Sequence, residues 1–231
     1  MAEEYLTDDE QLEAVKQFLK ENGAWIAGGV LLALAIIFGS RFYRDHTNQE
    51  GMAASTLFGA ATTALEANDR TKSRTLADTI IKDHSGTPYA DQARLLLARL
   101  DVDEGKSLNA VAPLTQVMSD SKDSELRNVA RLRLARIQVD QGKPDEALKT
   151  LADPIPQGFA TPYREVRGDA YAAKKDTAAA VTEYQAALAS ADPGGIVASV
   201  LGLKIQDLGG SPGPAMKMKT VSTDSQPKAK P

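Results

Sequence analysis

Residues 22–40 contain no charged side chain, although charged residues make up 25% of the 231-residue chain. A helix over this run, NGAWIAGGVLLALAIIFGS, would be about 28 Å long at about 1.5 Å per residue, which matches the hydrocarbon core of a bilayer. No helical face of the run carries a polar stripe, whereas the helices of a soluble core usually have one. We therefore predict a transmembrane helix over residues 22–43 that places the chain in the lipid bilayer.

The flanks of this run favour an uncleaved membrane anchor over a secretory signal peptide. Residues 1–21 form an acidic N-terminal segment with seven carboxylates and two lysines, whereas the segment before the apolar part of a signal peptide is short and positive. No A-x-A-like cleavage site follows the run. The two lysines before the run nearly balance Arg41 and Arg44 after it, so the positive-inside rule leaves the orientation open.

The remainder of the chain divides into a helical domain and a tail. Residues 44–208 lack runs of alternating Val, Ile or Thr, so we predict helices and no strands there. Residues 209–231 are rich in Gly, Pro, Ser and Lys and are predicted to be disordered. A net charge of −4 argues against a nucleic-acid partner.

An internal repeat determines the architecture expected for residues 44–208. The segment ARLLLARLDVDEGKSLNAVAPL, which begins at Ala93, returns 37 residues later as ARLRLARIQVDQGKPDEALKTL. A third copy, around Gly168, follows at an offset of 33 residues. Each copy predicts a helix, a short turn and a second helix, with small residues where the helices cross. Because one helix pair cannot bury its apolar face alone, these periods predict a helical-hairpin solenoid and an all-α chain.

The repeats resemble a known family. The segments LARIQVDQGKPDEAL and RGDAYAAKKDTAAAVTEYQAAL are similar to tetratricopeptide repeats, although Arg94, Arg131 and Arg164 stand where that repeat has a bulky apolar residue. The preceding hairpin, about residues 53–84, fits as helix, Asn-Asp-Arg and helix. Over most of residues 5–208, the chain resembles the YfgM-like family of ancillary SecYEG translocon subunits in the order of its segments. That order is EQLEAVKQFLKENG, the apolar span, RFYRDH and then the repeats.

This resemblance implies a location and a set of partners. It implies a single-pass protein of the bacterial inner membrane with its N-terminus in the cytoplasm and its repeats in the periplasm. It also implies contact with the SecYEG translocon, with a PpiD-like periplasmic chaperone and with exported polypeptides. We therefore predict a membrane-anchored, non-enzymatic scaffold at the Sec translocon. Two alternatives stay open: a self-assembling repeat module that organises another membrane complex, and an adaptor that faces the cytoplasm.

The sequence offers no constellation that favours catalysis. Neither His46 nor His84 belongs to a metal-ligand spacing. Residues 101–105, DVDEG, resemble the start of a calcium loop, but Lys106 stands where that loop needs Gly and Ala112 where it needs Glu. We therefore expect no enzyme activity, no cofactor and no metal site.

Two surfaces are predicted to bind partners. In the tetratricopeptide frame Arg99 and Arg136 hold equivalent positions on the concave face, where two guanidinium groups could clamp a carboxylate; ion pairs with neighbouring acids are the alternative. The predicted concave set is Gln92, Arg99, Val102, Val129, Arg136 and Val139. In the membrane span, the small residues Ala24, Gly28, Ala35 and Gly39 lie within about 60° on a helical wheel and could pack against another membrane helix.

Overall fold

The computed structural model describes residues 8–152, 154–156, 158–192 and 195–212, and every regular element within these ranges is an α-helix. The predicted all-α class is therefore confirmed. The chain divides into two compact units, Met1–Thr56 and Leu57–Pro231, and the division falls inside the long first helix, α1 (Asp8–Glu66). The sequence places the start of the repeat domain at residue 44, earlier than this division.

The first unit contains the apolar run as part of α1. Its large side chains are exposed: Trp25 is 85% exposed, and Leu31 and Phe38 are each 67% exposed. A stretch that begins at Ala27 is long and apolar enough to cross a membrane, and none of its apolar window is buried within the protein. The structure therefore does not support a core-helix reading of this run, since a core helix would be covered by other elements.

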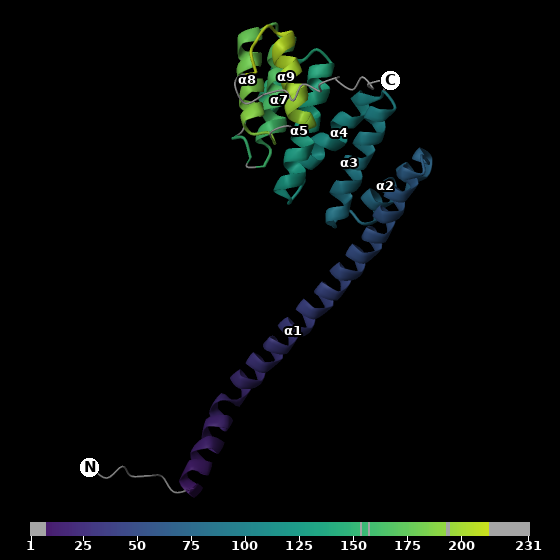
Figure 1. Ribbon diagram of the computed structural model, residues 1–231. Coiled ribbons are helices and arrows are strands. Elements are labelled where there is room, and N and C mark those ends of the chain that lie inside the picture. The colour runs from purple at the N-terminus through teal and green to yellow at the C-terminus, as the bar shows by residue number, and fades with distance from the viewer. Residues whose placement is uncertain (1–7, 153, 157, 193–194, 213–231) are drawn as a thin grey trace, which may run out of the picture. The chain divides into compact units, whose positions relative to one another are not determined.

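The second unit is a stack of helical hairpins (Figure 1). From α2 onward, consecutive helices pack against each other, and α5 also contacts α3 and α7 across the hairpins. Helices α3, α5 and α7 therefore lie in one layer of the stack. The helices of this unit after α1 are α2 (Arg70–Asp83), α3 (Pro88–Asp103), α4 (Ser107–Asp120), α5 (Ser124–Asp140), α6 (Pro144–Thr150), α7 (Ala160–Ala173), α8 (Thr177–Ala189) and α9 (Ile196–Asp207).

Local sequence signals explain where several of these helices begin. The side chain of Asp69 accepts a hydrogen bond from the Lys72 N–H at the start of α2. Asp123 and Asp176 cap α5 and α8 in the same way. These aspartates satisfy backbone donors that have no partner within the helix. Helices α3 and α6 begin instead with proline, whose fixed φ suits the first helical position.

The hairpin turns repeat one backbone conformation. Asn68, Gly105, Gly142 and Lys175 all have left-handed φ angles between 60° and 73°, at successive offsets of 37, 37 and 33 residues. At each turn the following N–H bonds back across the helix end, as from Lys143 to the Gln138 carbonyl at 2.8 Å. This is the Schellman arrangement, which ends a helix and reverses the chain. The first turn is the Asn-Asp-Arg turn predicted between residues 53 and 84.

Small residues occupy the crossings between paired helices. The residue at the crossing point is buried on both helices of each hairpin. It is alanine or glycine on the first helix and alanine or serine on the second helix. Close crossing lets the hairpins stack into three neighbouring hydrophobic clusters along the array. The crossing residues are Ala61, Ala98, Ala135 and Gly168 on the first helices, and Ser73, Ala110, Ala147 and Ala180 on the second helices.

The last described helix of the array is α9. Gly209 repeats the left-handed turn with a φ of 75°, and the Gly210 N–H donates to the Ile205 carbonyl at 2.9 Å. The Gln185 side chain donates to the Ser211 carbonyl at 2.8 Å. Most of the tail predicted at 209–231, namely 213–231, lies outside the described residues, as do residues 1–7 of the acidic segment.

Candidate partner-binding groove

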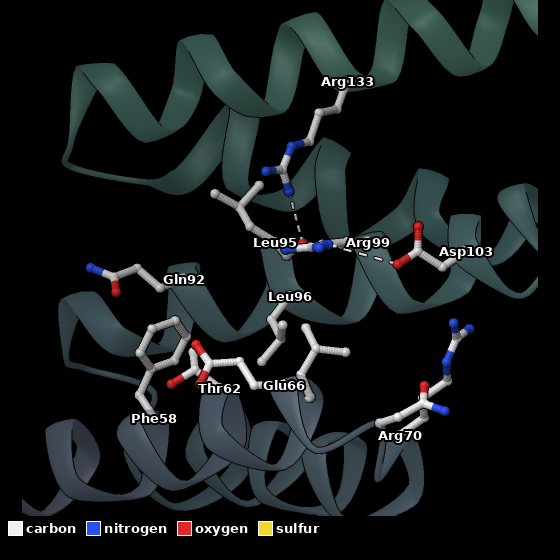
Figure 2. Close-up of a pocket in the computed structure, with 12 residues that line it drawn as sticks. Phe58, Thr62, Glu66, Arg70, Gln92, Leu95, Leu96, Arg99, Asp103 and Arg133 are labelled. Carbon is white, nitrogen blue, oxygen red and sulfur yellow. Dashed lines mark hydrogen bonds and ion pairs between the residues drawn. The ribbon is translucent and has the colours of Figure 1, made fainter.

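Two adjoining hollows lie along the odd-numbered helices of the second unit. The first, of about 530 Å³, lies between the end of α1 and α3, and the second, of about 290 Å³, lies between α3 and α5. They share Arg99, Asp103 and Arg133, so they form one continuous depression, which we call the arginine groove. Figure 2 shows the first hollow with Arg133 reaching toward α3.

Three arginines converge on this groove. The Arg133 Nη1 atom donates a hydrogen bond to the Leu95 carbonyl oxygen at 3.0 Å (Figure 2). Arg99 lies 3.7 Å from the Asp103 carboxylate one turn further along α3. Arg136 lies 3.9 Å from the carboxylate of Glu165 on α7. Burial, and then the positive charges of Arg99 and Arg136, lower the pKa of Arg133 below its ordinary value.

Among the described residues, the ion pairs expected for Arg99 and Arg136 are long contacts of 3.7 and 3.9 Å. Arg99 meets Asp103, one of the acids that the sequence offers, whereas Arg136 meets Glu165 of the next hairpin. Glu104 pairs instead with Arg74 and Lys106.

The other predicted concave residues divide into two groups. Gln92 lines the first hollow, and Val102 and Arg136 line the second, so the structure brings them together with Arg99. Val129 packs against the cluster between α3 and α5, and Val139 packs against the cluster between α5 and α7. Neither valine is among the residues that line the two hollows, because both sides of α5 face neighbouring hairpins.

The repeat frame does not place Arg133 on the concave face. This residue lies three positions before Arg136, which places both on one face of α5. That spacing is the signal that could have identified it. The equivalent position one repeat earlier is Leu96, so a comparison between repeats alone hides the arginine.

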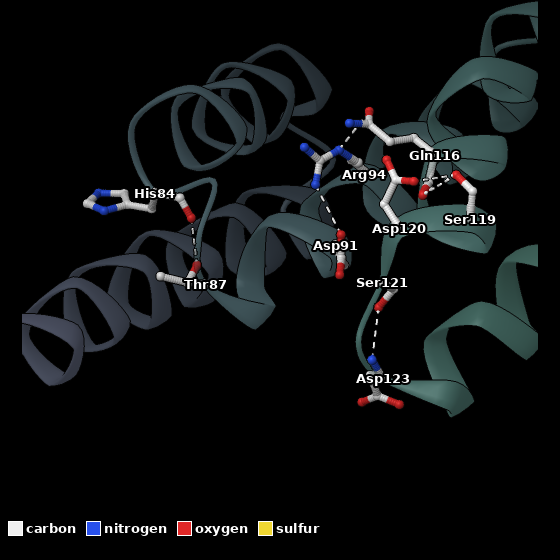
Figure 3. Close-up of polar contacts among 9 residues, drawn as sticks. All are labelled: His84, Thr87, Asp91, Arg94, Gln116, Ser119, Asp120, Ser121 and Asp123. Atoms are coloured by element: carbon white, nitrogen blue, oxygen red, sulfur yellow. Dashed lines mark hydrogen bonds and ion pairs between the residues drawn. The ribbon is translucent and has the colours of Figure 1, made fainter. Parts of the chain in front are cut away.

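Arginines outside the groove hold the hairpins together. Arg94 donates to the carboxylate of Asp91 and to the side-chain oxygen of Gln116, each at 3.1 Å (Figure 3). Arg74 lies 2.8 Å from Asp101, which ties α2 to α3. These contacts explain how arginine is accommodated at position 94, where a tetratricopeptide repeat has a bulky apolar residue: its guanidinium bridges α3 and α4.

A second polar cluster fixes α9. Lys204 donates to Glu165 at 2.9 Å and to Asp169 at 2.8 Å, and the Tyr184 hydroxyl donates to Asp169 at 2.7 Å. Burial acts to lower the pKa of Lys204, but the two carboxylates outweigh it and raise that pKa. Burial and the Asp169 carboxylate also raise the pKa of Tyr184. Because Glu165 belongs to both clusters, Lys204 neutralises the acid that faces Arg136.

The described residues hold no group of three or more His, Cys, Asp or Glu side chains that could bind a metal ion. Near His84, the Thr87 hydroxyl donates to the His84 backbone carbonyl at 2.8 Å, which caps the end of α2 (Figure 3). The second hollow is lined by arginine, aspartate and aliphatic side chains.

Comparison with known proteins agrees with this architecture. A family model described as a tetratricopeptide repeat-like domain matches residues 16–210. A protein of Escherichia coli (strain K12) named "Ancillary SecYEG translocon subunit" is 33% identical over 204 residues, which cover 88% of this chain and 98% of that protein. The chain belongs to this family. The resemblance and the repeat-like fold predicted from the sequence are thereby confirmed.

Other members of the family carry the same name. A Neisseria gonorrhoeae protein is 26% identical over 207 residues, which cover 88% of this chain and 98% of its own length. A Haemophilus influenzae protein is 26% identical over 182 residues, which cover 79% and 89% of the two chains. No solved structure matches the chain.

Proposed function

We propose that the chain is a non-enzymatic scaffold that associates with the SecYEG translocon in the bacterial inner membrane. The observation that carries this proposal is the likeness to proteins named as ancillary subunits of that translocon, at 33% identity over 98% of the Escherichia coli relative. The stack of helical hairpins supports it, since repeat proteins of this kind present extended binding surfaces.

Co-purification from native membranes tests the association. Full-length protein with an affinity tag at its C-terminus is extracted in a mild detergent, and the eluate is probed for the translocon subunits. We expect the translocon to be enriched over an unrelated single-pass membrane protein carrying the same tag. Equal recovery with both proteins would remove the proposal.

The apolar part of α1 would hold the repeats at the membrane face. Such a tether raises the effective concentration of the repeats near the channel without any new contact. We propose that the N-terminus lies in the cytoplasm and the repeats in the periplasm. A reporter enzyme that is active only outside the cytoplasm, fused after Pro231, should then be active. An inactive but stably produced fusion would favour the adaptor that faces the cytoplasm.

The repeats would recruit a PpiD-like chaperone or an exported polypeptide through the concave face. A photo-reactive amino acid at position 99 or 136 should trap one of these partners in intact cells. The matched control is the same amino acid at position 149, where an exposed lysine lies on α6 away from the groove. Adducts of equal yield from all three positions would show that the groove has no special role.

Self-assembly is the second candidate, and one feature of α9 favours it. This last described helix exposes Ile196 (85%) and Leu203 (53%), together with Val197 (49%) and Val200 (40%). A helix that ends a repeat array usually has a polar outer face, so this aliphatic face would suit a second copy of the chain. The mass of the detergent-solubilised protein, measured at several concentrations, tests this. A monomer throughout the range would exclude it.

A further inference from the structure

The chemistry of the arginine groove indicates what kind of partner segment it would hold. We propose that the groove binds a peptide segment in which acidic side chains lie next to aliphatic ones. This inference rests on the proposed scaffold function and deepens it by naming the chemistry that the partner must present.

The first argument is that the groove arginines have weak internal partners. The carboxylates nearest to Arg99 and Arg136 lie at 3.7 and 3.9 Å, which is too far for a direct hydrogen bond. By contrast, Arg74 and Arg167 pair with acids at 2.8 Å. The ion pairs of the two groove arginines are therefore longer than those that Arg74 and Arg167 form with their acids.

The second argument concerns Arg133. Its hydrogen bond to the Leu95 carbonyl fixes the guanidinium in the groove but supplies no negative charge. Within the described part of the chain, no carboxylate lies within ion-pair distance of Arg133, and the charges of Arg99 and Arg136 act on it unfavourably. A bound carboxylate would relieve this repulsion at a half-buried site, where screening by water is weaker than at the surface.

The third argument is that the acids around the groove do not cancel its positive charge. The second hollow is lined by three arginines but by only two acids, Asp103 and Asp140. The further acid near Arg136 is Glu165, and Lys204 already donates to it at 2.9 Å. An anionic segment is therefore the complementary partner for this surface.

The fourth argument comes from the walls of the groove. Beside the arginines, the second hollow is lined by Ala98, Leu114, Ile137 and Val102, and Val102 is 45% exposed. An exposed valine between charged residues offers contact area to an aliphatic side chain. A ligand that places a carboxylate against the arginines and an aliphatic group against Val102 would use both features.

Binding of defined peptides to the full-length protein in detergent tests the proposal. The probe is a short fluorescent peptide of alternating aspartate and leucine, acetylated at its N-terminus and amidated at its C-terminus. A second peptide has asparagine in place of aspartate, and a third is this neutral peptide with a free C-terminal carboxylate. We expect the first peptide to bind and the second to bind at least about tenfold more weakly, because the second has no carboxylate to accept charge-assisted hydrogen bonds from the groove. The third peptide has a single carboxylate, at its C-terminus, and should therefore also bind more weakly than the first.

Paired substitutions locate the binding. The double variant Arg99→Gln, Arg136→Gln should weaken binding of the acidic peptide at least about tenfold, and Arg133→Lys should weaken it through loss of the planar fork. The matched control, Lys72→Gln with Lys149→Gln, removes the same charge from exposed positions outside the groove and should change binding less than about twofold. Melting curves verify that every variant is folded.

Several outcomes would overturn the proposal. The first is that the asparagine peptide binds as tightly as the aspartate peptide, and the second is that the peptide with the free C-terminus binds more tightly than the aspartate peptide. The third is that the arginine and lysine double variants lose the same amount of binding. The fourth is that the protein binds anionic vesicles and not the peptide, and that this binding depends on Arg99 and Arg136. None of these would affect recovery of the translocon in the co-purification experiment, so failure of this inference can be told apart from failure of the scaffold function.

Discussion

Gly168 and Tyr184 are matched in size within one crossing. A Cβ added to Gly168 would lie 2.4 Å from Cε1 of Tyr184, and the Tyr184 hydroxyl is held by Asp169. At the equivalent crossing one repeat earlier, Ala135 shares a cluster with Leu151. The larger side chain on α8 is thus accommodated by the smaller residue on α7.

This matching makes a testable prediction. Gly168→Ala should destabilise the repeat domain by about 1–2 kcal/mol, because overpacking outweighs the better helix propensity of alanine. The double variant Gly168→Ala, Tyr184→Leu recreates the pair Ala135 and Leu151 of the preceding repeat. Its loss of stability should therefore be smaller than the sum of the losses in the two single variants. Chemical denaturation followed by circular dichroism measures the cycle. Additive effects would show that the two positions do not limit each other.

Lys204 makes the stability of α9 depend on pH. Its folded-state pKa is raised, so its contribution to stability is fully present below the ordinary lysine value of about 10.4 and is lost as pH rises through the folded-state pKa. The raised pKa of Tyr184 acts in the same direction. We expect the melting temperature to fall above about pH 10. Lys204→Met should lower the melting temperature at pH 8 and flatten this fall; an unchanged alkaline slope in the variant would contradict the assignment.

At the scale of the helical element, one turn conformation ends the first helix of each hairpin formed by α1–α8. Gly142 has a φ of 71° and Lys175 a φ of 64°, and such angles are strained for a residue with a Cβ. Gly142→Ala should therefore cost about 1 kcal/mol, whereas Lys175→Gly should stabilise by up to about 1 kcal/mol. Urea denaturation of the two variants measures whether the free energy of unfolding falls in the first and rises in the second. A loss of stability in both would show that the Lys175 side chain outweighs its backbone strain.

The apolar part of α1 has a face of small residues whose role the fold does not explain. A Cβ at Gly28 or Gly39 meets no atom within 4 Å, so nothing within the chain requires glycine there. We predict that Gly28→Leu with Gly39→Leu abolishes co-purification of a membrane partner, because close helix packing needs small residues. The matched control, Leu31→Ile with Leu34→Ile, changes side-chain shape in the same span. Unchanged recovery of the partner with the glycine variants would remove this face as a docking surface.

For the molecule as a whole, the two units should behave differently toward membranes. The full-length chain should stay with the membrane fraction in alkaline carbonate, because its apolar run is exposed and long enough to span a bilayer. A variant that lacks residues 1–44 should be soluble, helical and cooperatively folded, because the clusters between α3 and α9 lie within the second unit. Release of the full-length protein by carbonate would contradict the membrane anchor.

The sequence by itself determined the class and order of the elements. The uncharged run and the 37-residue offset are periodic, local signals, and hydrophobic burial translates such signals directly into a membrane-length helix and a hairpin stack. The repeat frame also puts Arg99 and Arg136 on one face, and both line the second hollow in the structure. These features follow from spacing along the chain, so no contact had to be known in advance.

Only the tertiary structure decided how individual side chains are used. Val129 and Val139 pack between hairpins, although the repeat frame placed them on the concave face. The partner of Arg136 proved to be Glu165 of the next hairpin, and Arg133 joined the groove. The physical reason is that ion pairs and burial depend on which hairpin lies against which. Packing sets that arrangement between residues far apart in the sequence.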